Sequence, residues 1–181
     1  AMQFLLMPRT GTPPLISAVE TEQARIADLM QRGSIHKAAS IWTDARLHPL
    51  YNTIEVRVCD MQTAPQEAAA LAVLTGAIAI WLAEQIQSGK QPDTGDDWLL
   101  REDRWQAARR GIGATLQQRQ GAQSVSDFWL AMLETLSPLL QQQQVGHIAD
   151  TIRTMLRNGG GAATQRLSWQ SRPPAALALV N

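Results

Sequence analysis

Two residues of opposite charge, Glu55 and Arg57, lie two positions apart in segment 53–58, which reads TIEVRV. Apolar and polar residues alternate there with period two, which is typical of a β-strand with one buried face. Glu55 and Arg57 then share the polar face. The carboxylate could hold Mg²⁺, and the planar guanidinium could grip phosphate oxygens that the cation bridges. An ordinary ion pair on an exposed sheet would give the same pattern, so the strand alone leaves both interpretations open.

Four segments follow the motifs of one enzyme family, namely PRTGTPP (8–14), IWTDARLHPLYNTIEVRVCD (41–60), DRWQAARRG (103–111) and NGGGAATQR (158–166). They resemble P-R-S-G-x-P-P, then W-D-x-R-P-x-P running into (F/Y)-G-T-(V/I)-E-(V/I)-R-x-x-D, then N-R-(W/F)-x-A-x-R-Y-G and G-N-G-A-x-R-Q-R. These motifs belong to the carboxylate–amine ligases of the glutamate–cysteine ligase type 2 family. Because the four segments occur in the family's order over nearly all of the chain, together they are far more specific than any single motif.

The resemblance covers one half of the family's catalytic domain. The family's enzymes are about twice as long, and their amino-terminal half carries a G-x-E-x-E strand and an H-x-H-x-G strand. Neither pattern occurs here, and the three histidines, His36, His48 and His147, include no pair at spacing two. The chain is therefore similar to the carboxy-terminal half of such a ligase.

The resemblance implies an ATP-dependent reaction in which the γ-phosphoryl group passes to a substrate carboxylate and an amine attacks the acyl phosphate. Mg²⁺ and arginines would neutralise the phosphoryl charge. Glu55 would be a catalytic residue and the Mg²⁺ ligand, and Arg57 the catalytic residue that grips phosphate. Asp44 and Arg46 would orient the substrate or Arg57. Arg104 and Arg109 would contact the nucleotide or the substrate carboxylate.

Two functions stay open. The chain could be the half of a ligase that acts on amino-acid and amine substrates, its partner being the amino-terminal half or further copies of itself. Alternatively, it could be a non-enzymatic half-domain that acts as a scaffold, regulatory or oligomerisation subunit. We expect no ligase activity from the chain alone, because without the acidic and histidine motifs the phosphoryl charge is under-compensated. The chain departs from the motifs at Thr43, Leu47, Asn52, Asp103 and Arg110. These departures allow an altered substrate or a loss of activity.

Composition predicts one globular domain, residues 1–181, with strands and a first helix in 1–63 and helices in 64–181. Apolar residues make up 45% and charged residues 18% of the chain, and the net charge is zero. This balance does not favour nucleic acid or an anionic membrane as a partner. Cys59 has no second cysteine to pair with, so a cytoplasmic protein is expected. We interpret Cys59 as a packed small hydrophobe rather than a nucleophile.

Hydrophobic periodicity and Gly/Pro breaks predict an α+β fold, with few antiparallel strands followed by a helical array. The expected strands are Gln3–Met7, 40–46 and 53–60, and the expected helices are 17–33 with Ser17 as its cap, 65–88, 97–111, 125–143, 145–157, 161–170 and 174–180. The apolar stretch 68–83 is shorter than a membrane span and predicts a helix buried on most sides. The resemblance implies half of a glutamine synthetase/guanidino kinase fold, whose exposed sheet edge and apolar face would promote self-association.

Overall fold

The chain forms two compact units, residues 1–60 and 61–181, in a computed structural model. The structure describes residues 7–16, 18–48, 51–91, 95–118 and 121–171, and the statements below refer to these residues. Three predicted features lie outside them: most of strand Gln3–Met7, the cap Ser17 and helix 174–180.

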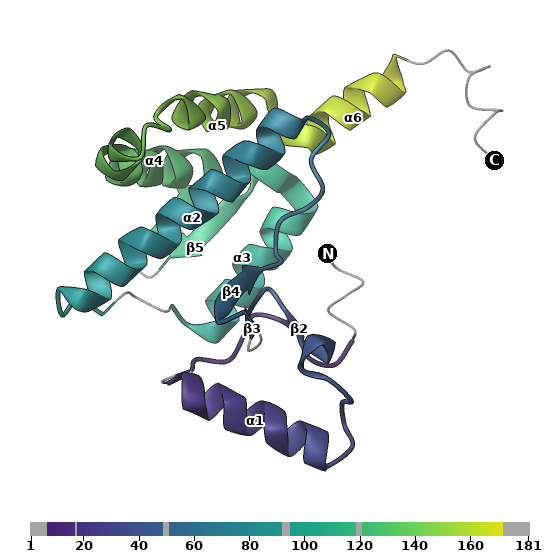
Figure 1. Cartoon of the computed structure of the whole chain (residues 1–181). Helices are drawn as coiled ribbons and strands as arrows, with labels where there is room; N and C mark the ends of the chain where they lie inside the picture. Colours follow the sequence, from purple (N-terminus) through teal and green to yellow (C-terminus); the bar gives the residue numbers. More distant parts are fainter. Residues whose placement is uncertain (1–6, 17, 49–50, 92–94, 119–120, 172–181) are drawn as a thin grey trace. The chain divides into compact units, whose positions relative to one another are not determined.

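The first unit combines one α-helix with short strands, and Figure 1 labels α1, β2, β3 and β4. Its elements are β1 (Thr10–Gly11), α1 (Val19–Gln31), the 3₁₀ helix η2 (Ala38–Ser40), β2 (Trp42–Thr43), β3 (Ala45–His48) and β4 (Thr53–Val56). β1 pairs with β2 in parallel, and β3 pairs with β4 in antiparallel orientation. The buried side chains of Ile26, Ile35 and Ile41 form a small core between α1 and the segment that leads into β2.

The predicted strand 40–46 is divided between two sheets at Asp44. The Asp44 N–H donates to the Gly11 carbonyl at 2.8 Å, next to the parallel pair, whereas the Asp44 carbonyl accepts from the Arg57 N–H at 2.7 Å, next to the antiparallel pair. A single residue therefore connects both sheets through its backbone. The predicted strand 53–60 ends its pairing at Val56, and the packed interpretation of Cys59 is wrong, because Cys59 is exposed.

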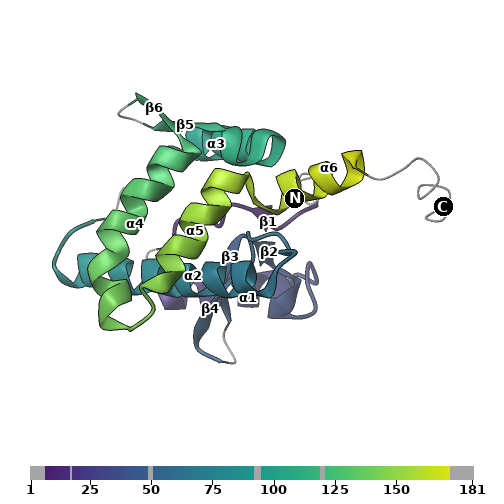
Figure 2. The same cartoon turned by 90° about the horizontal axis from the view of Figure 1, so that it is seen from above.

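The second unit is mainly helical, and its predicted helices 65–88, 97–111, 125–143, 145–157 and 161–170 are confirmed to within two residues at their ends. Its elements are α2 (Pro65–Gln87), α3 (Asp97–Arg110), the 3₁₀ helix η3 (Gly111–Gly113), β5 (Thr115–Gln118), β6 (Gly121–Ser124), α4 (Val125–Gln142), α5 (His147–Asn158) and α6 (Gly160–Gln170). Figure 2 shows α4 and α5 both running across α2. Buried residues of these three helices form the core, namely Ala70, Leu74, Ala77, Leu133, Leu136, Leu140, Ile148, Ala149 and Ile152.

Local chemistry explains where these helices begin. Pro65 occupies the first turn of α2, where its missing N–H costs nothing. The Ser124 hydroxyl accepts from the Asp127 N–H at 3.0 Å and so caps α4. Pro138, which was expected to kink or end its helix, does not end α4, which continues to Gln142.

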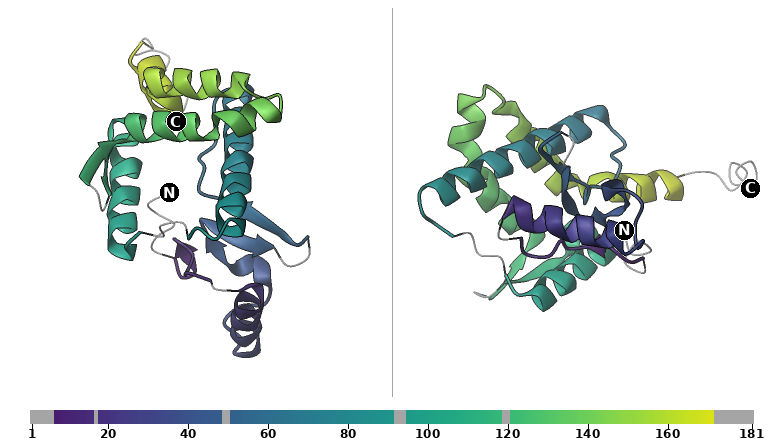
Figure 3. Two further views of the ribbon diagram at one scale, coloured as in Figure 1. Left: turned by 90° about the vertical axis from the view of Figure 1, so that its left-hand side faces the viewer. Right: turned by 60° about the horizontal axis from the view of Figure 1, so that its bottom comes forward.

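The hairpin of β5 and β6 was not predicted, because segment 115–124 lacks the alternation of a half-buried strand. The two strands are antiparallel, with Thr115 opposite Ser124, and Figure 3 (left) shows the hairpin where α3 gives way to α4. The Asp103 carboxylate on α3 accepts from the Gln117 N–H at 2.5 Å and ties the hairpin to that helix. With its helices and small, mostly antiparallel sheets the chain has an α+β fold, as predicted.

Helix α2 is buried on one side only, so the expectation that it is buried on most sides is wrong. Within the described residues it is the one helix long and apolar enough to cross a bilayer, and 17% of its apolar window is buried. Length and composition alone do not separate a membrane span from a helix packed inside a larger protein. Half of its exposed residues are alanine or glycine, for example Ala72, Gly76 and Ala79.

Gly159 separates α5 from α6, and its replacement tests why the chain has glycine there. Its φ is +79°, and a Cβ would lie 2.7 Å from the Ala163 Cβ, whereas Gly89 has the same φ with nothing within 4 Å. We expect Gly89→Ala to lower the free energy of unfolding by about 1 kcal/mol, the backbone cost alone. Gly159→Ala should cost about 1–3 kcal/mol more because of the clash. Urea denaturation followed by circular dichroism measures both, and equal losses would contradict the steric argument.

Candidate functional site

The charged residues singled out from the sequence meet on the β3–β4 hairpin. The antiparallel register places Arg46 directly opposite Glu55. Arg57 follows just after β4 on the same polar face as Glu55, because strand side chains alternate between faces.

Arg46 is the anchor of the hairpin. Its Nε and Nη2 both lie 2.7 Å from Glu55 Oε2, and its Nη1 donates to the carbonyls of Ala39 and Ile41 at 2.8 and 2.9 Å. The side chain is 10% exposed. Three of the five guanidinium N–H groups donate hydrogen bonds, and Nη2 lies within ion-pair distance of Glu55. Arg46 therefore holds Glu55 and the 3₁₀ turn in place, and its expected role toward substrate or Arg57 stays a prediction.

Arg57 is more accessible. Its Nη1 lies 2.9 Å from Glu55 Oε1, and its side chain is 32% exposed. We expected Glu55 and Arg57 not to be paired, and Arg57 to have at most one carboxylate partner, with Asp44 the likeliest. Arg57 has one such partner among the described residues, but it is Glu55, which also pairs with Arg46. Asp44 contacts Arg57 through its backbone carbonyl. Arg57 is not buried in a structural pair, so its guanidinium can still reach a ligand.

The arrangement is positively charged overall. One carboxylate lies between two guanidinium groups, so the three side chains carry a net charge of +1. The hydrogen bond from Arg46 is the main cause that lowers the pKa of Glu55 below its ordinary value, and partial burial opposes it. The hydrogen bond from Arg57 lowers the pKa further. Glu55 is therefore fully ionised at neutral pH and serves both arginines.

The apolar face of β4 is the exposed one. Ile54, Val56 and Val58 are 70%, 42% and 54% exposed, whereas the Glu55 side chain on the opposite face is 36% exposed. The alternation of the sequence correctly separates the two faces, but within the described residues nothing buries the apolar one. An exposed apolar strand face of this kind is typical of a surface that another element covers.

The second unit carries the other two expected site residues, both on α3. Arg104 is half-buried. Arg109 is exposed, and its guanidinium carbon lies 5.1 Å from the centre of the Trp105 ring, which is the geometry of a cation–π contact. Asp103, whose departure from the family motif cast doubt on a binding role, holds the β5–β6 hairpin instead.

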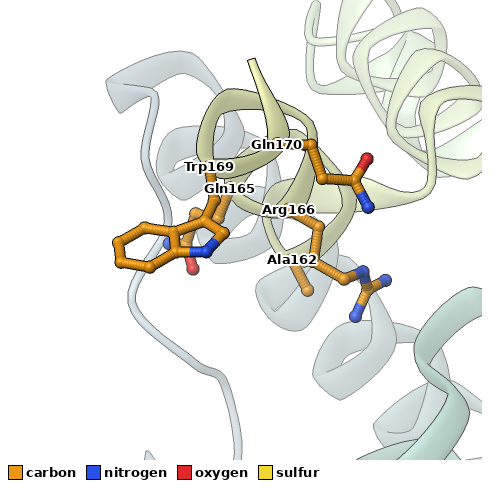
Figure 4. Close-up of a pocket in the computed structure, with 5 residues that line it drawn as sticks. All are labelled: Ala162, Gln165, Arg166, Trp169 and Gln170. Carbon is orange, nitrogen blue, oxygen red and sulfur yellow. The ribbon is translucent and has the colours of Figure 1, made fainter. Parts of the chain in front are cut away.

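The glycine segment 158–161 acts as a helix connector. Gly159 has the left-handed conformation and ends α5, and α6 begins at Gly160. Gly159 is therefore the C-cap of α5. Figure 4 shows a surface pocket on α6 that was not predicted from the sequence, where Trp169 is 55% exposed. Its lining residues, all from this helix, are Ala162, Gln165, Arg166, Trp169 and Gln170.

The Mg²⁺ ion implied by the resemblance does not fit the described residues. Mg²⁺ prefers an octahedron of oxygen ligands, and these residues bring together no group of three or more His, Cys, Asp or Glu side chains. Both oxygens of Glu55 already accept from arginines. A cation at Glu55 would also lie beside two guanidinium groups, which repel it.

The described residues form an α+β protein with an Arg46–Glu55–Arg57 cluster on the β3–β4 hairpin. A family model described as glutamate-cysteine ligase family 2 matches residues 2–175. The chain is 28% identical over 165 residues to a candidate glutamate–cysteine ligase 2-1 of Frankia alni, covering 90% of this chain and 43% of that protein. It is 32% identical over 168 residues to a candidate glutamate–cysteine ligase 2-3 of Rubrobacter xylanophilus, covering 92% and 44%.

The chain therefore belongs to the glutamate–cysteine ligase family 2, as its motifs predicted. It spans less than half the length of the curated relatives it matches.

The lowered pKa of Glu55 predicts an acid-sensitive hairpin. A carboxyl group whose pKa is lowered by folding contributes stability above the ordinary glutamate value of about 4.3, and this contribution is lost as the pH falls through the lowered value. We expect the amide resonances of Arg46 and Glu55 to shift together in NMR spectra, with a midpoint below the ordinary glutamate value. Glu55→Gln should remove this transition. A midpoint at or above the ordinary glutamate value would contradict the two-arginine arrangement.

Proposed function

We propose that the chain is one part of an ATP-dependent ligase that joins a carboxylate to an amine. In the proposed reaction a substrate carboxylate oxygen attacks the γ-phosphorus of ATP and ADP leaves. The amine nitrogen then attacks the acyl carbon, and phosphate leaves. Membership of the family supports the class of protein, and the names of the relatives motivate glutamate as the carboxylate and cysteine as the amine.

The observation that carries the proposal is the state of Arg57. A guanidinium that is one-third exposed and held at one corner by a carboxylate is pre-oriented, and its remaining N–H groups can receive phosphate or carboxylate oxygens. Arg46 is nearly buried and supports the arrangement from behind. Because Mg²⁺ does not fit the described residues, we assign this chain only the binding and orientation of an anionic group.

The chain alone should release no ADP, and the complete ligase should depend on Arg57. We would co-express the chain with the portion of a family relative that it does not cover, and follow amide formation from glutamate and a panel of amines. Arg57→Lys should slow the reaction roughly 10²-fold, since lysine keeps the charge but loses the fork that stabilises the developing phosphoryl charge.

Arg32→Lys is the matched control, because Arg32 is also paired with one carboxylate in the same unit, Nε to Asp28 Oδ2 at 2.7 Å, but on helix α1. It should leave the rate unchanged. Turnover by the isolated chain, or equal effects of the two substitutions, would refute the assignment.

The exposed face of β4 favours a second candidate function, that of an association module. Val56→Thr should weaken any self-association of the chain, because it removes apolar area from the exposed strand face. Val19→Thr is the control, since Val19 is similarly exposed, 45% against 42%, but lies at the start of α1. Sedimentation velocity at micromolar concentrations measures the effect. A wild-type chain that is monomeric at every concentration would exclude the association module.

A further inference from the structure

The hairpin site has the charge and the free donors of an anion site. Arg46, Glu55 and Arg57 sum to +1, and each oxygen of the single carboxylate already accepts from a guanidinium. Among the described residues, Glu55 belongs to no group of three or more His, Cys, Asp or Glu side chains that could hold a metal ion.

We infer that Glu55 positions Arg57 instead of ligating a metal, and that this chain binds an oxyanion at the hairpin without a divalent cation. The inference deepens the proposed function and rests on it for the biological role of the site. It departs from the metal-ligand role that the family resemblance implies for Glu55. The cation of the ligase reaction would then be held by groups outside the described residues of this chain.

The two arginines have different roles. Three N–H groups of Arg46 donate hydrogen bonds, its Nη2 lies 2.7 Å from Glu55 Oε2, and its side chain is almost buried, so it has little to offer a ligand. Arg57 gives one side-chain N–H to Glu55 and exposes a third of its side chain. A bidentate contact to a phosphate or carboxylate group is therefore open to Arg57. Glu55 limits how far Arg57 can rotate, which lowers the entropy cost of binding.

Phosphate and carboxylate share this chemistry, so the test uses both. The intact chain, labelled with ¹⁵N, is titrated at constant ionic strength with inorganic phosphate and, separately, with acetate, without divalent cations. We expect the amides of the hairpin to shift with at least one anion. Arg57→Lys should weaken this binding about tenfold, the loss of roughly one charge-assisted hydrogen bond, and Arg32→Lys should leave it unchanged. The anion that binds more tightly identifies the source.

A second titration uses Mn²⁺, a paramagnetic substitute for Mg²⁺. We expect no line broadening centred on the hairpin of the wild-type chain. Broadening at Glu55 that disappears in Glu55→Gln would overturn the inference, and so would the absence of any hairpin response to either anion. Both measurements concern binding by the chain alone, whereas the proposed function is tested by amide formation in the complemented ligase, so each can fail while the other stands.

Discussion

The contact between Arg46 and Glu55 is the interaction on which the charged site depends. It joins directly opposite residues of the hairpin, and the same guanidinium holds two backbone carbonyls of the preceding 3₁₀ turn. Exposed ion pairs contribute little, commonly below about 1 kcal/mol, but Arg46 is nearly buried. Removing the carboxylate would leave that charge with neutral acceptors only, so this one pair stabilises the observed register of the hairpin and the direction of Arg57.

The sequence predicted the helices of the second unit well for physical reasons that are local. Pro65 marks the start of α2, Ser124 caps α4, and Gly159 ends α5 through a backbone conformation that other residues rarely adopt. The strands were predicted less well because their partners are distant in the sequence or poor in alternation. Asp44 divides a run of strand-forming residues between two sheets, and only the contact with Gly11 reveals this division. The β5–β6 hairpin depends on Asp103, twelve positions before β5 begins.

The sequence predicted which residues make up the candidate site, but not which of their side chains contact one another. Period-two alternation placed Glu55 and Arg57 on one face, and the family motifs added Arg46 and Asp44. Which carboxylate faces which guanidinium depends on strand register, which one residue of turn length changes. Alternation also defines two faces without saying which is covered. Here the face of Ile54 and Val56 is the more exposed one, because burial depends on a neighbouring element and not on the strand itself.

The charge of the site and the length of the chain together indicate which catalytic groups of the ligase this chain supplies. Phosphoryl transfer needs positive charge around the transferred group, and that charge can come from arginines or from metal ions. This chain, which spans less than half of its relatives, offers guanidinium groups whose single carboxylate is already engaged. Carboxylates that bind a cation must repel one another until the cation arrives, whereas Glu55 is neutralised in advance. The same carboxylate is poorly suited to both roles, so holding Arg57 in place makes it a weak metal ligand.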